Sequence, residues 1–216
     1  DHIMKSNFTA FVEHASAQTG QPDRELERVG DDDSLVAVED DVVDGADTLI
    51  AIANNASIDW SKVSNVEAVS GGSFSGVSIV GTAGNETFDF SGIALTGIAL
   101  IDGGAGDDTI TGSAGSDAIY GNAGLNTINA GGGNDTIRFG AGSTDKINGG
   151  SGTDTLTAIV NNASIAWAFV SEVEAVTAGS FTGVRIAGTD GNDIMNLNTV
   201  ALTKIAAIDG GQGDDD

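Results

Sequence analysis

Residues 103 to 157 form the segment GGAGDDTIT GSAGSDAIY GNAGLNTIN AGGGNDTIR F GAGSTDKIN GGSGTDTLT. It divides into six segments of nine residues, interrupted only by Phe139. The sixth position of each segment is Asp or Asn, and the eighth is Ile or Leu. A repeat of this kind fixes the architecture before any local prediction, because each unit must stack on its neighbours to bury its apolar side.

The residue types assign a structural role to each position of the repeat. Glycines permit positive φ, so six residues can form a tight turn whose carbonyls point inward. The other three residues form a short strand whose single aliphatic side chain enters the core. Two nonapeptides then make one turn of a flattened coil, so we predict an all-β, parallel β-roll or β-solenoid. Stacking of successive turns is expected to pair Asp117 with Asp135, Asp135 with Asp154, and Asp108 with Asn126.

The carboxylates brought together by this stacking require a counterion. Two like charges ~4 Å apart repel by about 4 kcal/mol at an effective dielectric constant of 20. One buried aliphatic side chain per nine ordered residues also gives little to offset the entropy lost on folding. A hard divalent cation with six to eight oxygen ligands in flexible geometry removes the repulsion, which describes Ca²⁺. Zinc would need Cys or His, but the chain has no cysteine and its two histidines precede the repeats.

The motif GGxGxDxUx resembles the calcium-binding nonapeptide of the RTX (repeats-in-toxin) proteins. The match is close from 103 to 157 and recurs as GTAGNETFD at 81–89, GTDGNDIMN at 188–196 and a truncated GGQGDDD at 210–216. The resemblance implies a parallel β-roll with calcium bound between turns. It also implies a bacterial protein, secreted or at the cell surface, that is exported by a type I pathway.

The candidate calcium ligands fall into two groups, the sixth-position side chains and the turn residues at the first, third and fifth positions. The sixth-position residues are Asp108, Asp117, Asn126, Asp135, Asp145 and Asp154, with Glu86, Asp193 and Asp215 in the outlying copies. The turn residues are Gly103, Ala105, Asp107, Gly112, Ala114, Ser116, Gly121, Ala123, Leu125, Ala130, Gly132, Asn134, Gly149, Ser151 and Thr153.

Several residues depart from the repeat pattern. Asn126 replaces Asp, which lowers the charge of its sites and predicts weaker binding there. Ala130 replaces the first glycine of its nonapeptide. The inserted Phe139 is expected to disturb the row that pairs Asn126 with Asp145. Glu86 is longer than Asp and is expected not to reach the same position.

A second, longer repeat organises the chain. The sequence from Asp47 recurs from Asp154, an offset of 107 residues, with 39 of 63 aligned positions identical and Trp60 equivalent to Trp167. The repeat breaks off at Asp216, so we expect a fragment of a longer protein. We predict that residues 1–30 hold a cloning remnant, a short helix and a linker, and that the acidic segment 31–46 is either disordered or a degenerate first turn. β-Solenoid rungs are expected at 47–101, followed by an RTX calcium β-roll at 102–157. Further rungs are expected at 158–187, and the truncated start of another RTX block at 188–216.

Composition narrows the function. The formal net charge of −24 excludes nucleic acid and anionic membranes as partners, and no apolar run is long enough for membrane insertion. The sequence has no HExxH, no GxSxG and no cysteine nucleophile, so we expect no enzyme activity. Two interpretations remain. The first is a calcium-dependent structural module of a large exported repeat protein, of adhesin or surface-layer type, whose partners are calcium ions and neighbouring repeats of the same chain. The second is the export and folding module of a type I-secreted protease or lipase. The sequence does not indicate a binding target.

Overall fold

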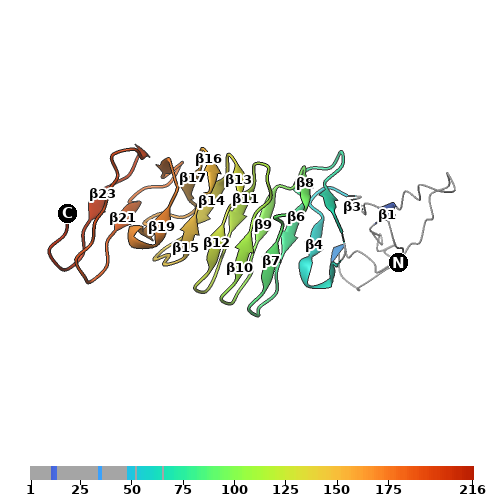
Figure 1. The fold of residues 1–216 in the computed structure, drawn as a ribbon, viewed down its shortest axis with the longest axis horizontal. Helices are drawn as coiled ribbons and strands as arrows, with labels where there is room; N and C mark the ends of the chain where they lie inside the picture. Colours follow the sequence, from blue (N-terminus) through green and yellow to red (C-terminus); the bar gives the residue numbers. More distant parts are fainter. Residues whose placement is uncertain (1–10, 14–33, 36–47, 52, 65) are drawn as a thin grey trace, which may run out of the picture.

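The computed structural model describes residues 11–13, 34–35, 48–51, 53–64 and 66–216. The chain winds into an elongated parallel β-solenoid of about eight turns, and its short strands lie side by side along the long axis in sequence order (Figure 1). The prediction of an all-β, parallel solenoid is confirmed.

The largest sheet has nine strands and runs along most of the solenoid. All of its pairings are parallel. Its members, in spatial order, are β2 (Ser34–Leu35), β4 (Ser57–Asp59), β6 (Ser78–Val80), β9 (Leu100–Asp102), β11 (Ala118–Tyr120), β14 (Thr136–Phe139), β17 (Thr155–Ala158), β20 (Ala175–Thr177) and β22 (Ala201–Thr203).

A five-stranded sheet contributes to the same core. It contains β7 (Thr87–Asp89), β10 (Thr109–Thr111), β12 (Thr127–Asn129), β15 (Lys146–Asn148) and β19 (Val170–Ser171). Three smaller sheets complete the described strands. The first contains β1 (Phe11–Glu13), β3 (Thr48–Ile50), β5 (Ala68–Ser70) and β8 (Ala94–Thr96), and the second contains β18 (Ser164–Ala166), β21 (Arg185–Ala187) and β23 (Ala207–Asp209). The third pairs β13 (Gly132–Gly133) with β16 (Ser151–Gly152). Two 3₁₀ turns, η1 (Trp60–Lys62) and η2 (Trp167–Phe169), occupy equivalent places in the long repeat.

The strand register follows the predicted eighteen-residue turn. Ile110 of β10 pairs with Ile128 of β12, and Ile119 of β11 pairs with Ile137 of β14. The next turn contains the insertion, and there Ile137 pairs with Leu156, one residue further along the chain.

The insertion of Phe139 does not disturb the stacking, so that expectation is wrong. Phe139 lengthens β14 to four residues and pairs with Ala158 of β17, and its side chain is fully buried. The backbone N–H of Asn126 still donates a hydrogen bond to Asp145 Oδ1 at 2.9 Å. The extra residue is tolerated because a large apolar side chain stabilises the core that receives it.

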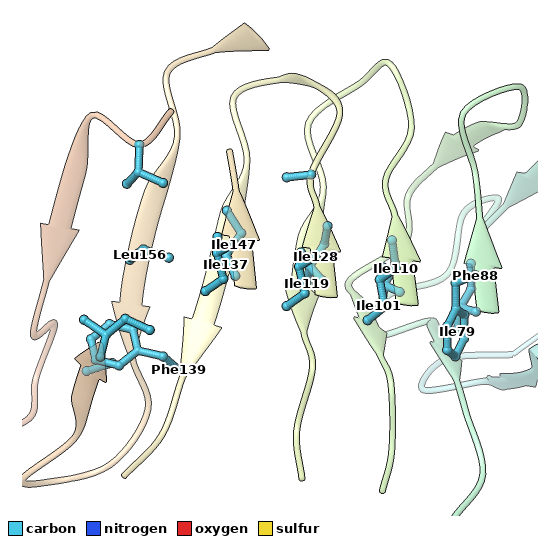
Figure 2. Close-up of a cluster of buried hydrophobic side chains, with 14 of the residues drawn as sticks. Ile79, Phe88, Ile101, Ile110, Ile119, Ile128, Ile137, Phe139, Ile147 and Leu156 are labelled. Carbon is cyan, nitrogen blue, oxygen red and sulfur yellow. The ribbon is translucent and has the colours of Figure 1, made fainter. Parts of the chain in front are cut away.

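The core is a stack of aliphatic and aromatic side chains, contributed mainly by the middle residues of the short strands. Most three-residue strands of the array bury only their middle residue, as alternation along a strand requires. Figure 2 shows the side chains in pairs along the stack. The pairs are Ile79 with Phe88, Ile101 with Ile110, Ile119 with Ile128, and Ile137 with Ile147.

Two further features concern the long repeat and the chain before it. The described residues between 48 and 101 form rungs whose core includes Leu49, Ile58 and Val69.

The helix expected within residues 1–30 is wrong for Phe11–Glu13. These residues form β1 and pair antiparallel with β3, so they supply backbone hydrogen-bond partners to the edge of β3. The rest of that segment, and 31–46 apart from Ser34–Leu35, lies outside the described residues. Among the described residues no helix has the length and apolar character needed to cross a membrane.

Candidate metal-binding ladders

The sixth-position side chains stack in two rows, which we call the first and second ladders. At each step the backbone N–H of one member donates a hydrogen bond to a side-chain oxygen of the next. The three steps of the first ladder measure 2.9 Å each, and those of the second measure 2.8, 2.8 and 2.7 Å. The first ladder consists of Glu86, Asp108, Asn126 and Asp145; the second consists of Asp117, Asp135, Asp154 and Glu174.

The pairs expected from the sequence are present in these ladders. Asp117 donates to Asp135, Asp135 to Asp154, and Asp108 to Asn126. A shorter ladder joins Asp193 to Asp215 at 3.0 Å near the end of the chain. The six sixth-position residues of the central array are all buried, and Asp154 is completely inaccessible to solvent.

Several carboxylates in the ladders have one oxygen without a partner. In Asp108, Asp135 and Asp154, Oδ1 accepts the ladder hydrogen bond, whereas Oδ2 is buried and has no hydrogen-bond partner. A buried carboxylate oxygen without a donor is costly, so it normally faces a cation or an ordered donor. These oxygens therefore mark the places where a cation fits.

Backbone carbonyls converge on the same places. A Cβ built on Gly103 would meet Asp108 Oδ2 at 2.6 Å and the carbonyl oxygen of Gly121, one turn further on, at 2.8 Å. Carboxylate and carbonyl oxygens together are the ligand set of Ca²⁺. Among the described residues no three His, Cys, Asp or Glu side chains gather as a metal-binding group, so a cation here would depend on these carbonyls.

Burial and neighbouring charge raise the pKa values of the ladder carboxyls. Burial raises the pKa of Asp135 to about 6, and the charges of Asp154 and Asp117 add to the effect. The pKa of Asp108 is raised by burial and then by the charge of Glu86. The pKa of Asp117 is also raised by burial. The ladders thus disfavour charge wherever no cation is bound.

The first member of each ladder is bonded differently from the members that follow. Asp117 Oδ2 accepts hydrogen bonds from the backbone N–H of Ser113 at 2.7 Å and from its hydroxyl at 2.9 Å. Thr189 donates to Asp193 in the same way. The Glu86 carboxylate accepts a hydrogen bond from the backbone N–H of Thr82 at 2.9 Å and another from the Thr82 hydroxyl. The expectation that Glu86 would not reach the aspartate position is therefore wrong, because its longer side chain folds back onto the second residue of its turn.

The predicted turn residues also stack between turns. The fifth positions form their own hydrogen bonds: Asn134 N–H to Ser116 Oγ at 3.0 Å, Thr153 N–H to Asn134 Oδ1 at 2.9 Å, and Leu125 N–H to Asp107 Oδ1 at 2.8 Å. The third positions also meet between turns: Ala105 pairs with Ala123, Gly132 pairs with Ser151, and Ala114 lies close to Gly132. At the first positions, Gly103 approaches Gly121, Gly112 approaches Ala130, and Gly149 approaches Glu172.

Sequence reasoning missed several residues of the ladders. Glu174 closes the second ladder, although it lies outside any nonapeptide. Asn85 accepts a 2.8 Å hydrogen bond from the Asp107 N–H, and Ser113, Thr82 and Thr189 bond the first carboxylates. The hydroxyl residues could have been found from the sequence, because they occupy the second position of the nonapeptide in the first turn of each ladder. In the next turn of the first and second ladders that position is a glycine, Gly104 or Gly131. Glu174 had no such signal, because it lies twenty residues after Asp154 rather than one eighteen-residue turn.

These features define a class of protein: a parallel β-roll whose turns present stacked rows of carboxylate and carbonyl oxygens. The family model of the RTX calcium-binding nonapeptide repeat (4 copies) matches residues 102–137, 111–144 and 139–156. The chain therefore contains RTX calcium-binding nonapeptide repeats, as the sequence of residues 103–157 indicated. Comparisons with curated proteins and with solved structures gave no match.

Proposed function

We propose that this chain is a calcium-dependent structural module of a large exported bacterial repeat protein, of adhesin or surface-layer type. The observation that carries the proposal is the set of buried, unpartnered Oδ2 atoms of Asp108, Asp135 and Asp154. The RTX repeats support calcium as the ion. Export and a surface location rest on the family resemblance.

The proposed ligands are the ladder carboxylates and the first-position carbonyls that approach them. Bound calcium would supply the positive charge that the ladders lack. The protein contributes a frame in which backbone N–H groups already fix Oδ1 of Asp135 and Asp154. Because Oδ2 is then held away from water, the cost of burying its charge falls mainly on the calcium-free protein. Folding of the array and calcium binding should therefore be coupled.

The long repeat supports a structural role. The rungs and the start of the array that follows them occur twice at an offset of 107 residues, and repeated stacking is how solenoid proteins build long, stiff scaffolds. The RTX β-roll is a calcium-binding structural domain, and no enzyme family matches the chain. The module would lengthen and stiffen its parent protein where calcium is present.

The test is a calcium titration of the EDTA-treated protein, followed by far-ultraviolet circular dichroism and isothermal calorimetry. We expect β signal to appear with an affinity near ~10⁻⁴–10⁻³ M, the range of extracellular calcium modules. Magnesium at the same concentration serves as the control and should produce little change, because it prefers a tighter octahedral site with several waters. An EDTA-treated sample with the spectrum of the calcium form and no heat of calcium binding would overturn the proposal.

A further inference from the structure

The segment Ser171–Glu174 lies beyond the last nonapeptide, yet it repeats the hydrogen bonds of a nonapeptide turn. The Gly149 N–H donates to the Ser171 carbonyl at 3.0 Å, as the N–H of a first-position residue does to the ninth residue of the adjacent turn. The Asp154 N–H donates to Glu174 Oε2 at 2.7 Å, as each ladder residue does to the next. Glu174 thus occupies the sixth-position place in a turn that contains no aspartate.

Glu172 occupies the first-position place in the same turn. A Cβ built on Gly149 would meet the Glu172 carbonyl oxygen at 1.9 Å, just as one on Gly112 would meet the Ala130 carbonyl at 2.1 Å. Glu172 has φ of +52°, a left-handed conformation that is uncommon for a residue with a side chain. Three residues, Glu172 to Glu174, therefore replace the usual six of the turn.

The oxygen that faces this shortened turn has no partner. Asp154 is completely buried, and its Oδ2 accepts no hydrogen bond. The same hypothetical Cβ on Gly149 lies 2.8 Å from this Oδ2, so the oxygen and the Glu172 carbonyl converge on one place. Glu174 uses Oε2 for the ladder bond and retains its second oxygen as a potential ligand.

We propose that Asp154, Glu174 and the Glu172 carbonyl form an additional calcium site at the junction between the array and the following rung. The proposal rests on the calcium-binding function proposed above. The residues Glu172 and Glu174 lie outside the segment matched by the RTX family model. They fall in the segment 158–187, which the sequence predicts to be β-solenoid rungs and not part of the calcium β-roll. Such a site would fasten β20 to β17, so that calcium orders the start of the rung as well as the array.

The alternative is that Glu174 only accepts a hydrogen bond and binds no ion. Glu174→Gln separates the two, because an amide oxygen can still accept the Asp154 N–H but carries no charge. Asp89→Asn is the matched control, since it removes an equal charge from an exposed carboxylate that lies outside the ladders. Calorimetry on the full chain should show one calcium fewer, or at least a tenfold weaker affinity for one ion, in Glu174→Gln. Asp89→Asn should bind as the parent does.

Terbium luminescence gives a second, local measurement. Trp167 and Glu174 line the same surface pocket, so a Tb³⁺ ion at the junction should be sensitised by Trp167. In a Trp60→Phe background, Glu174→Gln should reduce this emission and Asp89→Asn should not. Unchanged calcium stoichiometry, affinity and terbium emission in Glu174→Gln would overturn the junction site alone. A parent chain that binds no calcium would instead overturn the proposed function.

Discussion

The backbone N–H of Asp135 donates a 2.8 Å hydrogen bond to Oδ1 of Asp154, which lies nineteen residues further along the chain. This bond fixes the carboxylate between two turns, while Oδ2 of the same group stays buried without a partner. The ladder therefore positions a charged oxygen whose burial is unfavourable until a cation meets it. Stability and calcium affinity should change together when a ladder residue is altered.

Asp135→Ala is expected to release at least one calcium per chain and to lower the melting temperature of the calcium-loaded protein. Asp135 lies in the middle of the second ladder, between Asp117 and Asp154, so its loss affects two neighbouring turns. Calorimetry and thermal circular dichroism measure both effects. Asp89→Ala is the control, because this exposed strand carboxylate lies outside the ladders. Unchanged stoichiometry in Asp135→Ala would show that the pairing does not serve binding.

Asn126→Asp should have opposite effects with and without calcium. Asn126 Nδ2 donates to Asp145 Oδ1 at 3.1 Å, a bond that a carboxylate cannot make. The new charge would repel Asp145 and lower the melting temperature in EDTA, but it should tighten calcium binding at that step. Calorimetry and melting curves in both conditions test this. A variant that binds calcium no more tightly than the parent would contradict the prediction.

Gly124→Ala should destabilise the array in the presence and absence of calcium. Gly124 has φ of +125°, and a Cβ there would lie 1.9 Å from the Gly106 carbonyl oxygen. Backbone strain alone should lower the free energy of unfolding by ~1–3 kcal/mol, and the clash adds to it. Gly92→Ala is the matched control, because a Cβ at Gly92 meets no atom within 4 Å. Equal denaturation midpoints for the two variants would refute the steric argument.

Acidification should stabilise the calcium-free protein and weaken calcium binding. The pKa of Asp135 is raised to about 6 from its ordinary value of 3.8, so between these values the folded protein holds a proton that the unfolded chain releases. Stability in EDTA therefore rises as the pH falls from 7 towards 4, and is lost as the pH rises through about 6. Melting temperatures across this range test the sign. Asp135→Asn should flatten the slope, whereas a stability that falls steadily on acidification would contradict the assignment.

The rungs before the array should retain structure when calcium is removed. Their core includes Leu49, Ile58, Val69 and Ile79, all buried, and they lack the aspartate period of the array. Hydrogen exchange in EDTA should therefore show slower exchange at 66–80 than at 103–157. Protection confined to 103–157 would be the opposite result and would show that the rungs depend on the array.

The solenoid, its turn length and the ladder pairs could all be predicted from the amino-acid sequence. A nine-residue period with one aliphatic residue per unit leaves a single way to bury that residue, and this also sets Asp117 beside Asp135. These are local properties, because glycine conformation and strand alternation depend on neighbouring residues.

The way in which the irregular positions are accommodated became visible only in the folded chain. Phe139 enters the core by extending β14, and Glu174 takes the aspartate place after a shortened turn that begins at a left-handed Glu172. Neither outcome follows from spacing, because both depend on which groups of the preceding turn lie opposite. The nine-residue period predicts how regular nonapeptides stack on one another. The fit of an irregular turn depends instead on the backbone donors and buried oxygens of the turn on which it packs.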